Sequence, residues 1–154
     1  MKSTESAQER KPATITLAPN PANHCFGCGG ANEDGMKLTF VQDNEKRRII
    51  GRFVLGERYQ GGGGMAHGGI IATLLDEAMG KVCRFREKRA VTAELTVQYL
   101  KPVSVQGEIV VEGWEEAEQE GRNLFHVGEI RNAAGDVLAR GRARFVVIGE
   151  ARRV

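Results

Sequence analysis

The fold of this chain is decided by the stretch His67-Gly68-Gly69-Ile70-Ile71-Ala72-Thr73-Leu74-Leu75-Asp76-Glu77-Ala78-Met79-Gly80. Its apolar residues recur at the three- to four-residue spacing of an α-helix, and the pattern continues to residue 84. The members of this apolar stripe are Ile70, Ile71, Leu74, Leu75, Ala78, Met79, Val82 and Cys83. A stripe this wide predicts a helix over residues 68–84 whose apolar face packs against the core.

A second line of residues follows the edge of the stripe at spacing i, i+4, i+7 and i+11, and consists of Gly69, Thr73, Asp76 and Gly80. A glycine inside a helix costs about 1 kcal/mol relative to alanine, which is understandable where a ligand or another backbone comes close. Asp76 is the carboxylate on this line, so it is the candidate catalytic residue. Glu77 lies about 100° further round the helix and is a candidate substrate contact instead.

The start of the predicted helix carries another candidate feature. Gly68 and Gly69 follow His67 directly, and the first-turn amides of a helix have no partner within the helix and carry partial positive charge. Because glycine has no Cβ, a ligand oxygen can approach those amides. This arrangement suits an oxyanion hole, where losing one donor typically costs about 10²–10³ in rate; a tight turn is the structural alternative. His67 either holds the turn by hydrogen bonding, which we favour, or acts as a catalytic base.

The distance between these two features has a consequence for assembly. Gly68 and Asp76 are eight residues apart, which corresponds to about 12 Å along a helix. One carbonyl carbon and its oxygen cannot contact both residues within a single subunit. If both act on the same bond, the active site is shared across a two-fold interface, with two sites per dimer.

Outside the helix the sequence is typical of strands. Apolar and β-branched residues predict strands over residues 36–42, 48–55, 91–100, 109–114, 124–130 and 137–148. In residues 91–100, alternation places Val91, Ala93, Leu95, Val97 and Tyr99 on one face. One long helix and about six strands with short links predict an α+β fold with a mainly antiparallel sheet. We expect a single domain over residues 21–150, preceded by a disordered tail over the polar residues 1–20.

Composition argues against several functional classes. The 22 Lys and Arg residues nearly balance the 20 Asp and Glu residues, so the net charge of +2 gives no support for nucleic-acid binding. No apolar run approaches the roughly 20 residues of a membrane-spanning helix, and the first residues do not resemble a secretory signal. The three cysteines are an odd number, which does not suggest a disulfide framework. We therefore expect a cytoplasmic protein with no nucleic-acid or membrane partner.

The helix stretch and its flanks resemble a known family. The sequence His67-Gly68-Gly69, with an aspartate nine residues after the histidine, is similar to the signature of the PaaI-like branch of hotdog-fold acyl-CoA thioesterases. The upstream segment His24-Cys25-Phe26-Gly27-Cys28-Gly29 and residues 91–102 also resemble that superfamily. The resemblance covers residues 25–148. It implies a hotdog fold, in which the sheet wraps one central helix, assembled as a homodimer or homotetramer.

The resemblance also implies roles for individual residues in hydrolysis of an acyl-CoA to a free acid and CoA. Gly68 would donate its amide to the thioester carbonyl, Asp76 of the other subunit would act as general base or nucleophile, and Thr92 would position the hydrolytic water. Many relatives have Asn or Gln six residues before the histidine, where this chain has Gly61, and Gln60 is the candidate replacement. No metal or redox cofactor is implied.

Two arginine clusters are candidates for binding the phosphates of coenzyme A, because guanidinium groups suit phosphate oxygens. The first follows the helix and includes Arg84 and Arg86. The second alternates along one predicted strand and consists of Arg140, Arg142 and Arg144. Solvated surface charge is the alternative interpretation of both clusters.

The cysteine-containing segment offers only three metal ligands, His24, Cys25 and Cys28, whereas structural zinc usually takes four. We expect it to be a metal-free loop folded over the sheet edge or the mouth of the site. Two other functions stay open, namely an acyl-CoA dehydratase or hydratase, which the same fold hosts, and a non-catalytic acyl-CoA-binding module. The first needs a placed histidine acting with an acid, and the second leaves Asp76 without a purpose.

Overall fold

The computed structural model describes residues 10–152. Within them the chain forms the helix α1 (Gly68–Lys81) and two short 3-10 helices, η1 (Glu57–Tyr59) and η2 (Val82–Arg86). The strands are β1 (Thr14–Leu17), β2 (Phe40–Asp43), β3 (Arg48–Val54), β4 (Lys88–Tyr99), β5 (Glu108–Glu115), β6 (Asn123–Asn132) and β7 (Val137–Glu150). Over these residues, no helix has both the length and the apolar character needed to cross a membrane.

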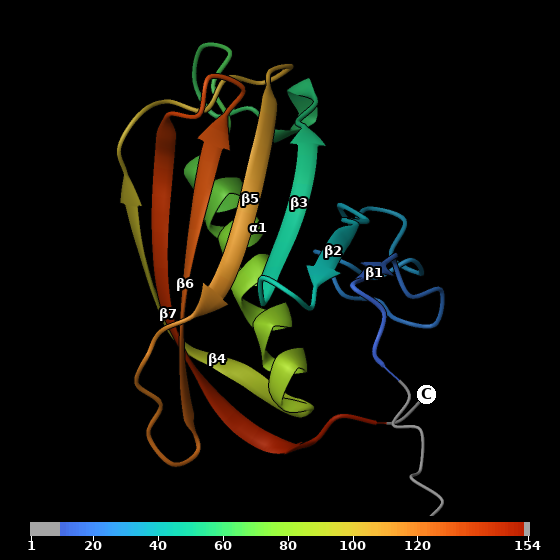
Figure 1. Ribbon diagram of the computed structural model, residues 1–154. Helices are drawn as coiled ribbons and strands as arrows, with labels where there is room; N and C mark the ends of the chain where they lie inside the picture. The colour runs from blue at the N-terminus through green and yellow to red at the C-terminus, as the bar shows by residue number, and fades with distance from the viewer. Residues whose placement is uncertain (1–9, 153–154) are drawn as a thin grey trace, which may run out of the picture.

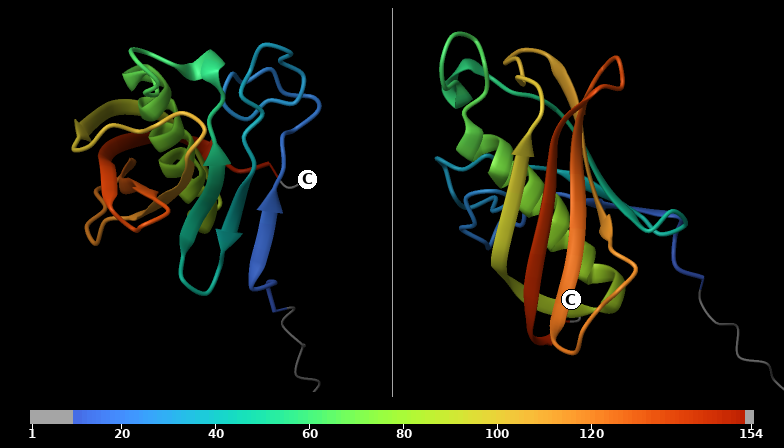
Figure 2. Two further views of the ribbon diagram at one scale, coloured as in Figure 1. Left: turned by 90° about the horizontal axis from the view of Figure 1, so that it is seen from above. Right: turned by 90° about the vertical axis from the view of Figure 1, so that its left-hand side faces the viewer.

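These strands form one antiparallel sheet in the order β1-β2-β3-β5-β6-β7-β4. The sheet curls around α1, which crosses its concave side (Figure 1). Viewed from above, the strands surround the helix on most sides (Figure 2). The predicted α+β class, the antiparallel pairing and the single long helix are therefore confirmed. The sheet of the described residues has seven strands where about six were expected.

The additional strand lies in the segment that was expected to be a disordered tail. Strand β1 pairs with β2, with Ile15 opposite Gln42 and Leu17 opposite Phe40. Leu17 packs against the core. The expectation of a tail over residues 1–20 is thus wrong for residues 14–17, because two alternating apolar residues suffice for an edge strand there. Residues 1–9 lie outside the described residues.

The apolar stripe of α1 forms the centre of the core. Leu74, Leu75, Ala78 and Met79 are fully buried, as predicted, and a large apolar side chain contributes about 1.5–3 kcal/mol when it is removed from water. They pack among sheet residues that include Phe40, Ile49, Val111, Ile130 and Phe145. The α-helix ends three residues before the predicted residue 84, because the chain tightens into η2 and then reaches Glu87, whose φ of 53° is left-handed.

Three glycines allow α1 to lie close to the sheet. Gly113 of β5, Gly128 of β6 and Gly141 of β7 are paired across the sheet in one row beneath the helix. A Cβ at Gly113 would lie 2.8 Å from the backbone of Ala78, and one at Gly141 would lie 2.9 Å from Cε of Met79. Side chains in this row would push the helix outward. The row therefore sets the distance of α1, and of its polar residues, from the sheet.

A β-bulge in β4 changes which side chains face the helix. Thr92 of β4 pairs with Phe145 of β7, and Glu94 pairs with the adjacent Arg144. Ala93 between them therefore has no partner residue on β7. Beyond the bulge Leu95 and Val97 pack against the core, as predicted. Before it the alternation is reversed, so that Val91 is 50% exposed and Thr92 turns toward α1. The predicted single face is therefore wrong at Val91 and Ala93, because one inserted residue exchanges the two faces.

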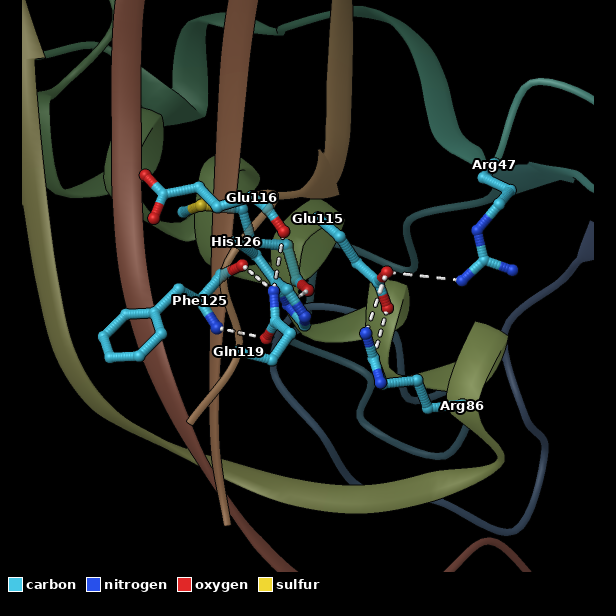
Figure 3. Close-up of polar contacts among 8 residues, drawn as sticks. Arg47, Arg86, Glu115, Glu116, Gln119, Phe125 and His126 are labelled. Atoms are coloured by element: carbon cyan, nitrogen blue, oxygen red, sulfur yellow. Dashed lines mark hydrogen bonds and ion pairs between the residues drawn. The ribbon is translucent and has the colours of Figure 1, made fainter. Parts of the chain in front are cut away.

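His126 of β6 is fully buried beneath the helix. Its Nδ1 lies 2.7 Å from the carbonyl oxygen of Met79 (Figure 3), so Nδ1 carries the proton and donates it. Its Nε2 has no hydrogen-bond partner among the described residues. Burial lowers the pKa of His126 below its usual 6.5, and the hydrogen bond to Met79 partly offsets this effect. The ring is therefore neutral at neutral pH.

Candidate functional site

A groove of about 610 Å³ lies beside the C-terminal half of α1. Asp76 of the helix and Thr92 of β4 both line it. The Thr92 hydroxyl donates a 2.8 Å hydrogen bond to Oδ1 of Asp76, a contact that depends on the bulge described above. Oδ2 of Asp76 accepts no hydrogen bond from residues 10–152. One carboxylate oxygen is thus held in place and the other is available to a ligand or water.

The surroundings of Asp76 favour its protonated form relative to a carboxylate in water. Burial raises the pKa of Asp76 above its usual 3.8, the hydrogen bond from Thr92 lowers it, and the charge of Glu77 raises it again. The net direction is upward. A carboxylate that has lost part of its hydration is a stronger base and nucleophile than an exposed one.

Glu77 lines the same groove but contacts different neighbours. One of its carboxylate oxygens accepts a 2.9 Å hydrogen bond from Nζ of Lys81, and Sγ of Cys25 lies 3.6 Å from the other. Burial raises the pKa of the Cys28 thiol to about 12, with opposing contributions from Lys81, which lowers it, and Glu77, which raises it. Glu77 and the cysteine-containing segment therefore form a cluster of their own next to Asp76.

Basic residues surround the groove. Arg84, Lys88, Arg89 and Arg152 line it together with Asp76. Nε of Arg84 donates a 2.8 Å hydrogen bond to Gln42, which holds the guanidinium at the rim. The groove therefore presents positive charge around Asp76, while its second carboxylate, Glu77, is paired with Lys81, an arrangement that suits an anionic ligand.

Arg86, predicted to act with Arg84, lies elsewhere. Its Nε donates a 2.7 Å hydrogen bond to Glu115, whose carboxylate also pairs with Arg47 (Figure 3). Arg86 is absent from the lining of the Asp76 groove, so the structure does not bring it to the candidate site. The second predicted cluster is also engaged in ion pairs, which join Arg140 to Glu129, Arg142 to Glu116 and Arg144 to Glu94.

A second groove, of about 420 Å³, lies at the start of α1. Gly61, His67 and Gly68 line it. Nδ1 of His67 accepts a 2.9 Å hydrogen bond from the amide of Gly69 and so caps the helix, which matches the favoured interpretation of His67. The amide of Gly68 has no acceptor within residues 10–152. It is therefore a free donor at the positive end of the helix.

Tyr99 contributes to this groove, although the sequence placed it only on one face of a predicted strand. Its hydroxyl donates a 2.9 Å hydrogen bond to the carbonyl of Gly68. Its ring lies 3.5 Å from the position that a Cβ on Gly68 would occupy. Tyr99 thereby fixes the peptide next to the free amide. The available signal was its place on the same face of β4 as Leu95 and Val97.

Three further predicted contacts lie outside both grooves. Gln60 forms an isolated bridge with Ala66, and its side chain is exposed. Oγ1 of Thr73 donates a 2.9 Å hydrogen bond to the carbonyl of Gly69, while the amide of Gly69 is taken by His67. Gly80 does line the Asp76 groove, and a Cβ there would meet only the Phe145 ring, at an ordinary 3.6 Å.

The two grooves have no lining residue in common. Strand β4 contributes Thr92 to one and Tyr99 to the other. Within the described sheet, β4 is an edge strand of 12 residues whose one partner is β7. Val91 and Tyr99 are 50% and 56% exposed on it. A long edge strand with exposed apolar side chains is a surface that soluble proteins usually cover.

Comparison with known proteins adds a family to this geometry. The acyl-coenzyme A thioesterase THEM4 of Rattus norvegicus is 35% identical over 91 residues, which are 59% of this chain and 39% of that protein. The chain spans less than half the length of the curated relatives it matches. Among solved structures, a thioesterase superfamily protein superposes with a TM-score of 0.74 at 28% identity, covering 80% of this chain and 60% of the other.

Other solved structures share the fold at lower identity. A hypothetical thioesterase of Streptococcus pneumoniae TIGR4, solved with coenzyme A, has a TM-score of 0.65 at 21% identity and covers 68% of this chain and 84% of that one. Two variants of it replace with alanine an aspartate and a threonine that are 16 positions apart. The PaaI protein of E. coli has a TM-score of 0.63 at 20% identity, over 68% of this chain and 75% of that one.

The match to a family model is the most direct of these findings. A model described as the thioesterase superfamily matches residues 63–139, which are half of the chain and include α1 and β4. The hotdog fold and the thioesterase superfamily expected from the sequence are thus confirmed, and the PaaI protein shares the fold. The chain belongs to the thioesterase superfamily.

Proposed function

We propose that this chain hydrolyses acyl-CoA thioesters to a free carboxylic acid and coenzyme A. The proposal is carried by the Asp76–Thr92 pair, in which a partly buried carboxylate keeps one oxygen free inside a basic groove. Asp76 acts on the thioester carbonyl carbon, either as a nucleophile or as a general base on water. Family membership and the likeness to acyl-coenzyme A thioesterase THEM4 support this reaction.

The free amide of Gly68 supplies the second catalytic element. It stabilises the negative charge that develops on the thioester oxygen, as donors of an oxyanion hole do. His67 and Tyr99 hold the flanking backbone, the first by capping the helix and the second by binding the Gly68 carbonyl. This pair of contacts fixes the direction of the amide before substrate arrives.

The complete site belongs to a homodimer. Gly68 and Asp76 of one chain are about 12 Å apart along α1 and line separate grooves. If two copies pair through their free β4 edges, antiparallel, the Tyr99 end of one strand lies near the Thr92 end of the other. The helix start of one copy then faces Asp76 of its mate, which gives two shared sites per dimer. Two such dimers can assemble further into a tetramer.

Coenzyme A is bound through its phosphates by the basic rim of the groove. Arg84, Arg89 and Arg152 are the candidate contacts, whereas Arg86 is occupied by Glu115 and Lys88 by Glu150. A solved relative contains coenzyme A, which supports this ligand class. Its aspartate and threonine variants have the same spacing of 16 residues as Asp76 and Thr92, which supports the choice of the catalytic pair.

The reaction needs no metal or redox cofactor, because a carboxylate and an amide donor supply both attack and charge stabilisation. The cytoplasm is the proposed location, in keeping with three cysteines that are all free thiols. A hydratase is less well supported, because Nδ1 of His67 is engaged in capping α1.

The experiment is a hydrolysis screen with short, medium, long and aromatic acyl-CoAs, read by a thiol reagent. Only a hydrolase releases free CoA; a hydratase or a binding module does not. Asp76→Asn should reduce the rate by roughly 10²–10⁴-fold, the usual range for a catalytic acid or base, while circular dichroism shows an intact fold. Unchanged CoA release by the folded variant would exclude Asp76 as the catalytic group.

A further inference from the structure

The loop over residues 20–35, which carries Cys25 and Cys28, is held against α1. Inside the loop, the side chains of Asn20 and Asn23 accept hydrogen bonds from backbone amides, including a 2.7 Å bond from the Cys25 amide. The Gly29 amide donates a 2.9 Å bond to the Cys25 carbonyl. The turn between the two cysteines is also held by the amides of Met36 and Leu38, which donate to the carbonyls of Phe26 and Gly27.

The same turn is fitted to the side chain of Glu77. A Cβ at Gly27 would lie 2.4 Å from Cδ of Glu77, so a side chain there would displace the Glu77 carboxylate from its present position. One at Gly29 would lie 2.4 Å from the Cys25 amide. The backbone between the cysteines therefore rests directly on the Glu77 carboxylate, and both thiols lie close to that carboxylate.

From this arrangement we propose that Cys25, Cys28 and Glu77 form a zinc site. One ligand atom from each lies within 4.8 Å of the other two, and Sγ of Cys25 is 3.6 Å from Oε1 of Glu77. In tetrahedral zinc, with Zn–S of about 2.3 Å and Zn–O of about 2.0 Å, a sulfur and an oxygen ligand lie roughly 3.5 Å apart. The Cys25–Glu77 pair already has nearly this spacing.

The charges of the cluster also fit a soft divalent ion. Two thiolates and one carboxylate give a zinc complex a net charge of −1, and the ammonium group of Lys81 lies 2.9 Å from Oε2 of Glu77. Glu77 thus offers Oε1 to the metal while Oε2 keeps its partner. The side chains of Lys81 and Glu77 are only 15% and 16% exposed. The positive charge of Lys81 balances only the charge of the Glu77 carboxylate. Two thiolates at this nearly buried position would add two negative charges, which require a further cation.

The chemical type of the ligands indicates which metal ion the cluster binds. The groove leaves room for a fourth ligand of that ion. Thiolate with carboxylate ligation suits zinc and argues against calcium or magnesium. Cys28, Glu77 and Lys81 line the same groove as Asp76, so a water can complete the tetrahedron from that side. The site would fasten residues 20–35 to α1 next to the catalytic carboxylate. Its role is to position this wall of the groove, and the chemistry stays with Asp76.

Zinc binding is tested directly on the full chain, reduced and freed of metal, by titration against a chromophoric chelator. We expect one zinc per chain. Cys25→Ser, Cys28→Ser and Glu77→Gln should each weaken binding by at least the roughly 10–100-fold typical of lost metal-site partners. Cys83→Ser is the matched control, because Cys83 is the remaining cysteine and lies buried in the core; it should bind zinc as the unaltered chain does.

Two measurements on the unaltered chain make the test independent of whether a variant folds. Cobalt should give the thiolate charge-transfer absorption of a tetrahedral sulfur site, and zinc should protect Cys25 and Cys28 from alkylation in a mass-spectrometric assay. Absence of stoichiometric zinc uptake by the reduced chain, or equal uptake by Cys28→Ser, would overturn the proposal. So would a Cys25–Cys28 disulfide whose reduction yields no zinc binding. None of these readouts depends on thioester hydrolysis.

Discussion

The Thr92 hydroxyl donates a 2.8 Å hydrogen bond to Oδ1 of Asp76 across the space between β4 and α1. The contact joins a strand to a helix and fixes the rotation of the carboxylate, so that its other oxygen is directed to whatever occupies the groove. It exists because the bulge at Ala93 turns Thr92 inward. The orientation of the candidate catalytic group is therefore set by one inserted residue.

Removing this hydroxyl should slow turnover while the fold stays intact. A hydrogen bond to a charged group is worth about 1.5–3 kcal/mol, equivalent to roughly 10–150-fold in rate. Thr92→Val keeps the shape and should lose activity by this factor in kcat, whereas Thr92→Ser should retain most of it. The measurement is steady-state hydrolysis of the best acyl-CoA from the screen. Equal rates for the valine and serine variants would show that the hydroxyl has no part in the reaction.

Gly68→Pro tests the amide donor without breaking the helix. Gly68 is the first helical residue, where proline is well tolerated and where the amide has no intrahelical partner. The preceding His67 has φ −63° and ψ 137°, the extended conformation that precedes proline readily. We expect a roughly 10²–10³-fold loss of kcat from the missing donor. Gly68→Ala, which keeps the amide, is the control and should stay within a few-fold of the unaltered rate.

The shared site can be tested by complementation between two inactive chains. In a heterodimer of Asp76→Asn with Gly68→Pro, one site combines the intact Gly68 of the first chain with the intact Asp76 of the second. If sites are shared, this heterodimer should regain about half of the dimer's activity, since one of its two sites is complete. If each chain carries its own site, both sites stay damaged. Co-expression with two different affinity tags isolates the heterodimer for assay.

The position of the helix and its candidate polar residues could be derived from the sequence because both depend on local spacing. The apolar period over residues 68–80 predicts the buried face of α1, and the four-residue line through Asp76 predicts its polar edge. His67 was correctly interpreted as holding the turn. These inferences need only the geometry of one helix, which the residues themselves encode.

The features that were missed all depend on the pairing of distant segments. Alternation in residues 91–100 cannot show an inserted residue, because a bulge is defined by the opposing strand β7. The contact of Glu77 with Cys25 joins residues 52 positions apart. The sequence suggested Arg86 as a phosphate ligand, but in the folded protein its guanidinium group is hydrogen-bonded to Glu115 of β5. Long-range contacts of this kind leave no periodic trace in one sequence.

Alanine in the glycine row should destabilise the fold. A Cβ at Gly113 would lie 2.8 Å from the backbone of Ala78, so the helix must move. Overpacking of this kind typically costs about 1–3 kcal/mol, and each kcal/mol lowers Tm by roughly 2–4 °C in a chain of this size. Gly56→Ala is the control, because nothing lies within 4 Å of its Cβ position and its φ of −75° suits any residue. Thermal unfolding of both variants compares the two positions; similar Tm values would mean that α1 does not rest on this row.

His126 should make the fold sensitive to acid. Burial lowers its pKa in the folded state below the usual 6.5, so the unfolded chain binds a proton more readily than the folded one. The contribution of the neutral ring to stability is then fully present above pH 6.5 and is lost as the pH falls from that value toward the lowered pKa. The cause is visible in the core: Nδ1–H already donates to Met79, and a proton on Nε2 would have no acceptor among the described residues.

The test compares pH slopes of stability rather than absolute values. Urea unfolding between pH 7.5 and 5 should show a slope from this one group of up to about 1.36 kcal/mol per pH unit, and His126→Gln should remove that part of the slope. His24→Gln serves as the control, since His24 is exposed. A slope that persists in His126→Gln but disappears in His24→Gln would assign the acid sensitivity to the surface. The expected result instead ties it to a ring packed directly beneath α1, at the level of Met79, three residues along the helix from Asp76.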